Sequence, residues 1–120
     1  MITIDEAWDV LDEAAAELPE DFFDALNGGV SLVPQSKRSD VPGLYTLGEY
    51  IRDPMGMGSY IMIYFGSFKR VFGHASDEEV KQELRRTLRH EFTHHIEALA
   101  GERDLEIKDA LYIEDYLDNG

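Results

Sequence analysis

The stretch His90-Glu91-Phe92-Thr93-His94 reads H-E-x-x-H and lies inside a segment with a helical period. Residues four apart on an α-helix lie one above the other on the same face, so both imidazoles can converge on one metal ion. The glutamate after the first histidine can reach a water molecule held by that metal, an arrangement used for metal-assisted hydrolysis. The stretch therefore predicts a long helix that carries a metal site and a general base.

The helix around the motif is predicted to begin at Ser76 or Asp77 and to end near Ala100, because Gly101 follows as a stop signal. At about 100° per residue, one face of this helix is apolar. The apolar stripe contains Val80, Leu84, Leu88, Phe92 and Leu99.

The motif residues take different positions relative to this stripe. His90 and His94 flank it, whereas Glu91 falls inside it. A carboxylate in an apolar sector is costly unless something compensates it, and a bound metal with its water would do so. Both histidines are thus predicted metal ligands and Glu91 the catalytic base. His95 points elsewhere, among apolar residues, and is predicted to be a core histidine that hydrogen-bonds to backbone or to a tyrosine.

The third protein ligand must come from beyond the motif, since a catalytic zinc site usually has three. The chain contains no cysteine, so a carboxylate is expected. A reversal at Gly101 would bring Asp104 back toward the metal, and Asp104 is the favoured residue. The alternatives are Glu97, Glu102, Glu106 and Asp109. Glu97 is on the correct side of the helix but about 10 Å along its axis from His90.

Composition limits the class of protein and of partner. The chain of 120 residues has the length of one domain, and its formal net charge of −14 disfavours contact with nucleic acids or anionic lipid. The N-terminus has no features of a secretory signal, and no apolar run reaches membrane-spanning length. The sequence thus predicts a cytoplasmic protein that binds no membrane.

The rest of the chain predicts an α+β fold. A first helix is expected after a cap at Thr3 or Asp5. Other predicted elements are a short helix at 20–26, strands at 30–33, 44–50 and 60–65, a loop at 52–59 and a last helix at 105–117. The strand at 60–65 is apolar on both faces, which predicts cover on both. Gly66 is expected to end it, with one irregular helical turn at 67–72. His74, in a glycine-flanked turn, is expected to be structural or exposed.

Several stretches together resemble a known family. They are Ala14-Ala15-Ala16-Glu17-Leu18-Pro19, Leu26-Asn27, Leu44-Tyr45 with Gly48, Tyr60-Ile61-Met62-Ile63-Tyr64 with Gly66 and Phe68, and Thr87-Leu88-Arg89-His90-Glu91-Phe92-Thr93-His94-His95. In these the chain resembles the bacterial zincin-like metallopeptidases, the mini-zincins. The resemblance implies a single zinc-bound minimal zincin domain over residues 1–120. In it a small sheet would pack against the long H-E-x-x-H helix, with N-terminal and C-terminal helices around it. The family's Gly-x-x-Asp element is retained at Gly101 to Asp104, but about one helical turn later.

These observations support two hypotheses. The first is a zinc-dependent peptidase in which His90, His94 and Asp104 bind Zn²⁺ and Glu91 activates water for attack on a peptide bond. An extended peptide would pair with the strand at 44–50 or at 60–65. Tyr45, Tyr60 and Tyr64 are candidates for stabilising the oxyanion, although each also suits a core position. The second hypothesis is a zinc-bound interaction module without catalysis. Metal-assisted RNA cleavage is disfavoured by the net charge.

Overall fold

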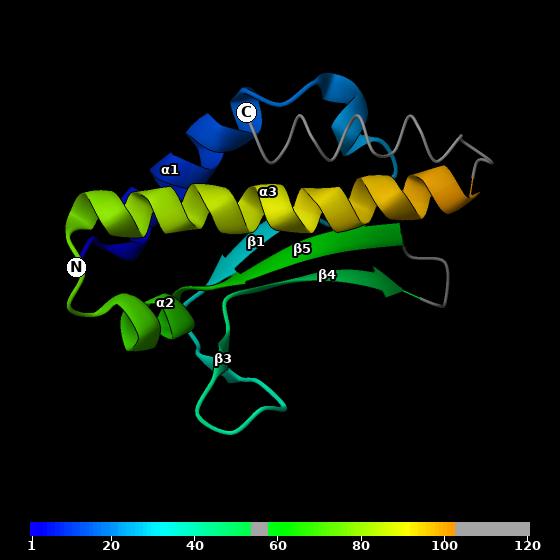
Figure 1. Ribbon diagram of the computed structural model, residues 1–120. Helices are drawn as coiled ribbons and strands as arrows, with labels where there is room; N and C mark the ends of the chain where they lie inside the picture. The colour runs from blue at the N-terminus through cyan, green and yellow to red at the C-terminus, as the bar shows by residue number, and fades with distance from the viewer. Residues whose placement is uncertain (54–57, 103–120) are drawn as a thin grey trace.

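Helix α3 (Asp77–Glu102) lies across one face of a three-stranded sheet in the computed structural model, and α1 (Ile4–Ala16) packs against α3 on the same side (Figure 1). The sheet has the order β1 (Gly29–Val33), β5 (Gly58–Tyr64), β4 (Gly48–Asp53). β1 runs parallel to β5, and β4 runs antiparallel to it. The structure describes residues 1–53 and 58–102, and the expected α+β class is confirmed.

The first helix begins where the sequence places a cap. The Thr3 hydroxyl accepts a hydrogen bond from the Glu6 amide at 3.1 Å, and the Glu6 carboxylate accepts one from the Thr3 amide at 3.1 Å. This reciprocal capping box satisfies two amides that lack helical partners. The next helix is shorter than predicted, because only the 3₁₀ turn η1 (Glu20–Phe23) forms. Ala25 has a φ of 59°, a left-handed conformation that ends any helical run.

Helix α3 begins as expected and ends later than expected. The Ser76 hydroxyl accepts the Glu79 amide at 3.2 Å, and all five residues of the predicted apolar stripe are buried. Gly101 lies inside the helix, so the predicted stop there is wrong. Glycine in a helix costs only about 1 kcal/mol relative to alanine, and burial of Leu99 and Ala100 offsets that cost. Asp104 and the predicted last helix lie outside the described residues.

The two strands β4 and β5 form an antiparallel hairpin that includes both ends of the predicted 52–59 loop. The predicted strand at 44–50 is divided at Leu47, whose carbonyl accepts the Tyr64 amide at 2.9 Å. Before this division, β3 (Tyr45–Thr46) pairs with β2 (Lys37–Arg38) as a separate antiparallel ribbon. The single predicted strand is therefore two short strands that belong to different sheets.

The central strand β5 is buried on one face only. Ile61 and Ile63 have no exposed surface and face α3, whereas Tyr60, Met62 and Tyr64 on the opposite face are half-buried. The predicted cover on both faces is wrong, because α1 and α3 both lie on the inner face (Figure 1). Of the elements that the structure describes, the β2–β3 ribbon contacts the outer face at the Tyr64 end, where Lys37 lies over the Tyr64 ring.

β5 ends at Tyr64, close to the strand end predicted at Gly66, and Gly66 itself lies within α2 (Phe65–Phe72), a helix of eight residues where one irregular turn at 67–72 was expected. A Cβ atom at Gly66 would lie 2.5 Å from the Gln35 carbonyl carbon, so only glycine lets this backbone approach. The Gly66 amide donates to the Gln35 carbonyl at 3.0 Å, and the Ser67 hydroxyl accepts the Lys37 amide at 2.9 Å. These bonds attach β2 to α2 and bring Lys37 toward the sheet.

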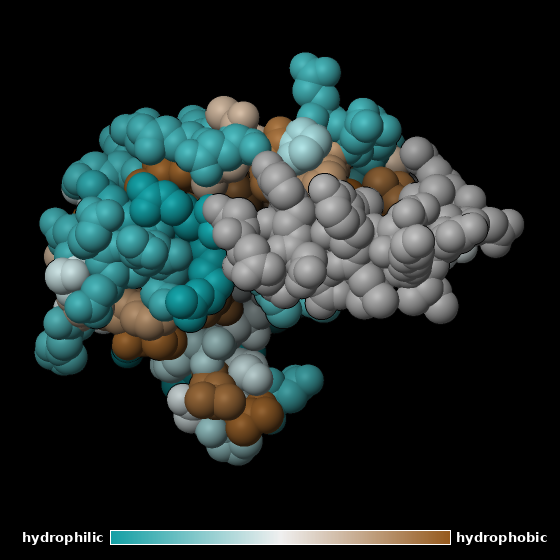
Figure 2. Space-filling model, turned by 45° about the horizontal axis from the view of Figure 1, so that its top comes forward, coloured by the Kyte–Doolittle hydropathy of each residue, from teal (hydrophilic) through white to brown (hydrophobic). Residues whose placement is uncertain are grey.

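The β2–β3 ribbon projects from the body of the molecule, and hydrophobic atoms gather on this projection (Figures 1 and 2). Val41 and Leu44 are 54% and 57% exposed there.

Among the residues that the structure describes, no helix has the length and apolar character needed to cross a membrane.

Candidate functional site

The two motif histidines converge on the solvent side of α3. Their Nε2 atoms lie 3.1 Å apart, with ring centroids separated by 4.6 Å and planes at 86°. Both residues are exposed, and the side chain of His94 retains 48% of its accessible surface. The pairing follows from helix pitch, because residues four apart stack on one face. The Nε2 atoms can therefore point at one site that is open to solvent.

This pair fits the ligand spacing of zinc. Two nitrogens about 2.0–2.1 Å from a shared tetrahedral ion lie about 3.3 Å apart, close to the observed 3.1 Å. Within residues 1–53 and 58–102, no group of three metal-ligating side chains comes together. Glu97 lies on the far side of the His94 ring, with its Oε2 atom 3.9 Å from Nδ1. From this position Glu97 can hydrogen-bond to the His94 ring and fix its orientation, but it is poorly placed to bind the metal itself as a third ligand.

Glu91 lies beside this pair, on the buried flank of the motif, and is only 6% exposed. Burial raises the pKa of its carboxyl above the ordinary value of 4.5. The nearby His94 ring and a hydrogen bond from the Tyr50 backbone amide act in the lowering direction, whereas the charge of Glu49 adds to the increase. The helical wheel predicted this buried position. A carboxyl group with a raised pKa beside two potential metal ligands suits a general base.

His95 is a core histidine, as predicted, and contacts both of the expected partner types. Its ring has no exposed surface. The Nδ1 atom lies 2.8 Å from the Tyr50 hydroxyl, and the Nε2 atom lies 2.7 Å from the Asp24 carbonyl oxygen. His95 therefore joins α3 to β4 and to the segment after η1, and it points away from the metal-ligand pair.

A groove of about 590 Å³ runs between α3 and the edge strand β4. It is lined by Glu49, Tyr50, Glu91, His94, Glu97 and Ala98. Glu49 accepts hydrogen bonds from the Lys37 ammonium and from the Tyr64 hydroxyl, both at 2.6 Å. The hydrogen bond from Lys37, and after it the one from Tyr64, lower the pKa of Glu49. Burial, together with the hydrogen bond to Glu49, raises the pKa of Tyr64 to about 12. The groove thus contains one carboxylate held ionised and one whose pKa is raised.

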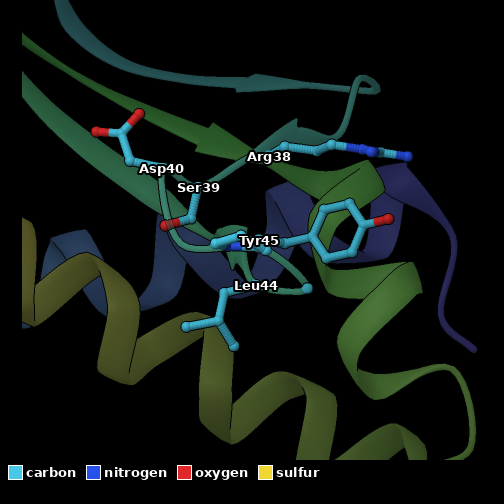
Figure 3. Close-up of a pocket in the computed structure, with 7 residues that line it drawn as sticks. Arg38, Ser39, Asp40, Leu44 and Tyr45 are labelled. Atoms are coloured by element: carbon cyan, nitrogen blue, oxygen red, sulfur yellow. The ribbon is translucent and has the colours of Figure 1, made fainter.

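A second hollow, of about 440 Å³, lies in the β2–β3 ribbon. Arg38 and Tyr45 extend to the same side of the ribbon there, while Asp40 points away from them (Figure 3). The Ser39 hydroxyl accepts a hydrogen bond from the Val41 amide at 3.2 Å, and none of the lining residues is a histidine. This hollow offers no paired nucleophile and base, so the groove beside α3 is the better candidate for chemistry.

Sequence reasoning missed two residues of the groove, Tyr50 and Glu49. The candidates Tyr45, Tyr60 and Tyr64 do not line it, and Tyr64 is bound to Glu49 instead. For Tyr50 the available signal was the alternation of the predicted strand at 44–50, which directs Gly48 and Tyr50 to one face. A Cβ atom at Gly48 would lie 2.9 Å from the Thr87 side chain, and this close packing of α3 identifies that face.

The remaining candidates are one described histidine and several acidic residues near the end of α3. His74 is exposed in a turn, as expected. The favoured third ligand, Asp104, and the alternatives Glu106 and Asp109 all lie outside the described residues, and the side chain of Glu102 does too.

Comparison with known proteins gives a likeness to a solved structure. No family model and no curated protein matches the chain. A solved structure of a conserved hypothetical protein from Thermo thermophilus is 33% identical in sequence and superposes with a TM-score of 0.73. The match covers 83% of this chain and 99% of that one.

Proposed function

We propose that this chain, which belongs to the same family as the conserved hypothetical protein from Thermo thermophilus, is a zinc-dependent peptidase of the minimal zincin type. One observation carries the proposal. The Nε2 atoms of His90 and His94 lie 3.1 Å apart at the surface of α3, while Glu91 is buried beside them at a groove. This combination supplies two metal ligands and one base within five residues.

In this proposal His90 and His94 bind zinc through Nε2, with the ring hydrogens on Nδ1. Glu97 lies next to Nδ1 of His94 and would accept that hydrogen, which fixes the ring orientation. A third carboxylate from the chain after Glu102 completes the protein ligands, and Asp104 is the first candidate. Zinc, when bound, would acidify a water molecule and polarise a peptide carbonyl.

Glu91 is the proposed general base. Its carboxylate lies beside the Tyr50 backbone at the groove, where it would take a proton from the attacking water. The same carboxyl group then gives the proton to the leaving amine. Its raised pKa favours both transfers, because a base with a pKa nearer the working pH also serves better as the acid of the next step.

The substrate class that suits the groove is an extended peptide. β4 is an edge strand of the described sheet and forms one wall of the groove. Edge strands present backbone donors and acceptors to a second chain, so we expect the peptide to pair along β4. Of the two strands considered from the sequence, the region 44–50 therefore suits substrate better than 60–65, because β5 has partners on both sides.

A second function, a zinc-bound interaction module without catalysis, is favoured by the exposure of both histidines and by the open groove. The buried position of Glu91 argues against it, because a structural site needs no carboxylate of raised pKa beside its ligands. Peptidase activity accounts for more of the site.

The test combines zinc analysis with digestion of a broad peptide library by the full chain. Wild type and Glu91→Gln should bind zinc equally, and the variant should cleave about 10²–10⁴-fold more slowly, the usual contribution of a general base. His74→Ala is a matched control for loss of an exposed histidine and should change neither property. Zinc binding without cleavage by wild type would favour the interaction module, and no zinc binding would exclude both functions.

The third ligand is tested separately by zinc affinity. Asp104→Ala should weaken zinc binding, whereas Glu97→Ala should weaken it less, because Glu97 contacts only Nδ1 of His94. If Asp104→Ala leaves the affinity unchanged, Glu106→Ala and Asp109→Ala identify the alternative.

A further inference from the structure

Tyr50 contacts two residues of α3 at once, with its main chain and with its side chain. Its backbone lies near enough to the Glu91 carboxylate to act in the lowering direction on the pKa of that carboxyl group, and its hydroxyl lies 2.8 Å from Nδ1 of His95. Glu91 and His95 are four residues apart and so lie on the same face of the helix. A single strand residue thus spans the buried side of the H-E-x-x-H-H segment.

The Tyr50 amide is available to Glu91 because of its place in the β4–β5 ladder. Bonded and non-bonded pairs alternate along an antiparallel ladder. The Tyr64 amide donates to the Leu47 carbonyl at 2.9 Å. The next bonded pairs are then Glu49 with Met62 and Ile51 with Tyr60, and Tyr50 opposite Ile61 is a non-bonded pair. The amide of Tyr50 therefore points outward from β4, toward Glu91.

His95 has a defined hydrogen-bonding direction in its neutral form. The Asp24 carbonyl oxygen, 2.7 Å from Nε2, can only accept, so Nε2 carries the hydrogen. The unprotonated Nδ1 then accepts the Tyr50 hydroxyl hydrogen. These two bonds hold the His95 ring between the Tyr50 hydroxyl and the Asp24 carbonyl, and they restrict the Tyr50 side chain as well.

We propose that His95 and Tyr50 are positioning residues that hold the Glu91 carboxylate at the angle needed for proton transfer. His95 fixes the Tyr50 side chain, and Tyr50 in turn presents its amide to one oxygen of Glu91, which directs the other oxygen to the groove. The proposal rests on the function proposed above for Glu91. A displacement of about 1 Å in such a group can reduce a rate by about 100-fold, so contacts that hold Glu91 in place preserve the rate. We call the contacts of His95 and Tyr50 that hold Glu91 the clamp.

Hydrogen exchange of the metal-free protein tests the clamp without any activity. In wild type the amide at position 50 should be protected, although it faces outward from an edge strand. Tyr50→Phe should raise its exchange about tenfold, the factor that corresponds to loss of a typical hydrogen bond. Glu91→Ala, which removes the acceptor, should raise it at least as much. The amide at Ile51, bonded in the ladder, reports overall unfolding and should stay unchanged.

The matched control is Tyr64→Phe, which removes another hydroxyl with a hydrogen bond, here to Glu49. It should leave exchange at position 50 unchanged. If Tyr50→Phe also leaves that exchange unchanged, the side chain does not hold the amide at Glu91 and the proposal is wrong.

A kinetic arm separates positioning from a purely structural role. With a peptide taken from the library digest, Tyr50→Phe should lower kcat about tenfold while KM and zinc content stay constant. His95→Gln, which retains one donor and one acceptor, should keep more activity than His95→Leu. Unchanged kcat in Tyr50→Phe would overturn the proposal. Absence of cleavage by zinc-loaded wild type would instead refute the peptidase function, and the exchange experiment would still decide whether the clamp exists.

Discussion

The two sides of α3 at the motif differ in how their functional groups are held. On the buried side, Glu91 and His95 are bound by partners from β4 and from the segment after η1. On the exposed side, His90 and His94 contact each other and Glu97, which within residues 1–53 and 58–102 are partners from α3 itself. The base is therefore positioned by tertiary packing before any ligand arrives, whereas the metal ligands are positioned by helix pitch.

The largest expected effect concerns the exposed side. His90→Ala or His94→Ala should weaken zinc binding by more than about 100-fold, because even loss of an outer contact costs about 10–100-fold. Neither change should alter the unfolding free energy of the metal-free protein by more than about 0.5 kcal/mol, since both side chains are exposed. Isothermal titration with zinc and chemical denaturation of the metal-free protein measure the two effects. If either variant unfolded much more easily than wild type without metal, His90 or His94 would be held by tertiary packing, and the difference between the exposed and the buried side of α3 would not exist.

The reverse pattern is expected on the buried side. His95→Leu should lower the unfolding free energy by about 2–4 kcal/mol, because the Tyr50 hydroxyl and the Asp24 carbonyl both lose the imidazole in the core. Zinc affinity of the folded fraction should change less than tenfold, since the ring points away from the ligand pair. The same two measurements apply. If zinc binding fell as far as in His94→Ala, His95 would belong to the metal site.

The smallest effect separates the two carboxylates of the groove by pH. Folding raises the pKa of Glu91 above 4.5, so the folded state binds that proton more tightly and stability falls as pH rises through the raised pKa. Folding lowers the pKa of Glu49 below 4.5, so its contribution is present above 4.5 and is lost as pH falls through the lowered pKa.

Chemical denaturation of two variants of the metal-free protein, between about pH 3 and pH 8, tests both expected directions of the change in unfolding free energy. At pH 7 Glu91→Gln should be more stable than wild type, and the difference should vanish in acid. Glu49→Gln should be less stable at neutral pH by about 1 kcal/mol or less, because its ion pair with Lys37 is partly exposed. If both variants were more stable than wild type at neutral pH, or both less stable, the groove would not shift the pKa values of Glu91 and Glu49 in opposite directions.

Local patterns predicted much of the fold correctly. The Thr3 cap, the strand at 30–33, the apolar stripe of α3 and the burial of Glu91 all follow from short-range periodicity. The errors concern elements whose limits depend on distant contacts. Gly101 was predicted to end α3 but lies inside it, next to buried neighbours. Gly66 was predicted to end the strand, which does end at Tyr64, but it also lies inside α2, where the Gln35 backbone passes.

The sequence by itself determined that His90 and His94 share one side of a helix, because a separation of four residues fixes that relation within a single turn. Only the tertiary structure decided what holds the base. Tyr50 is 45 residues from His95 in the chain, and Asp24 is 71 residues away. No periodicity connects such positions. Their contact exists because α3 crosses the edge strand β4 where Gly48 leaves room for it, and that crossing is a property of the packed core.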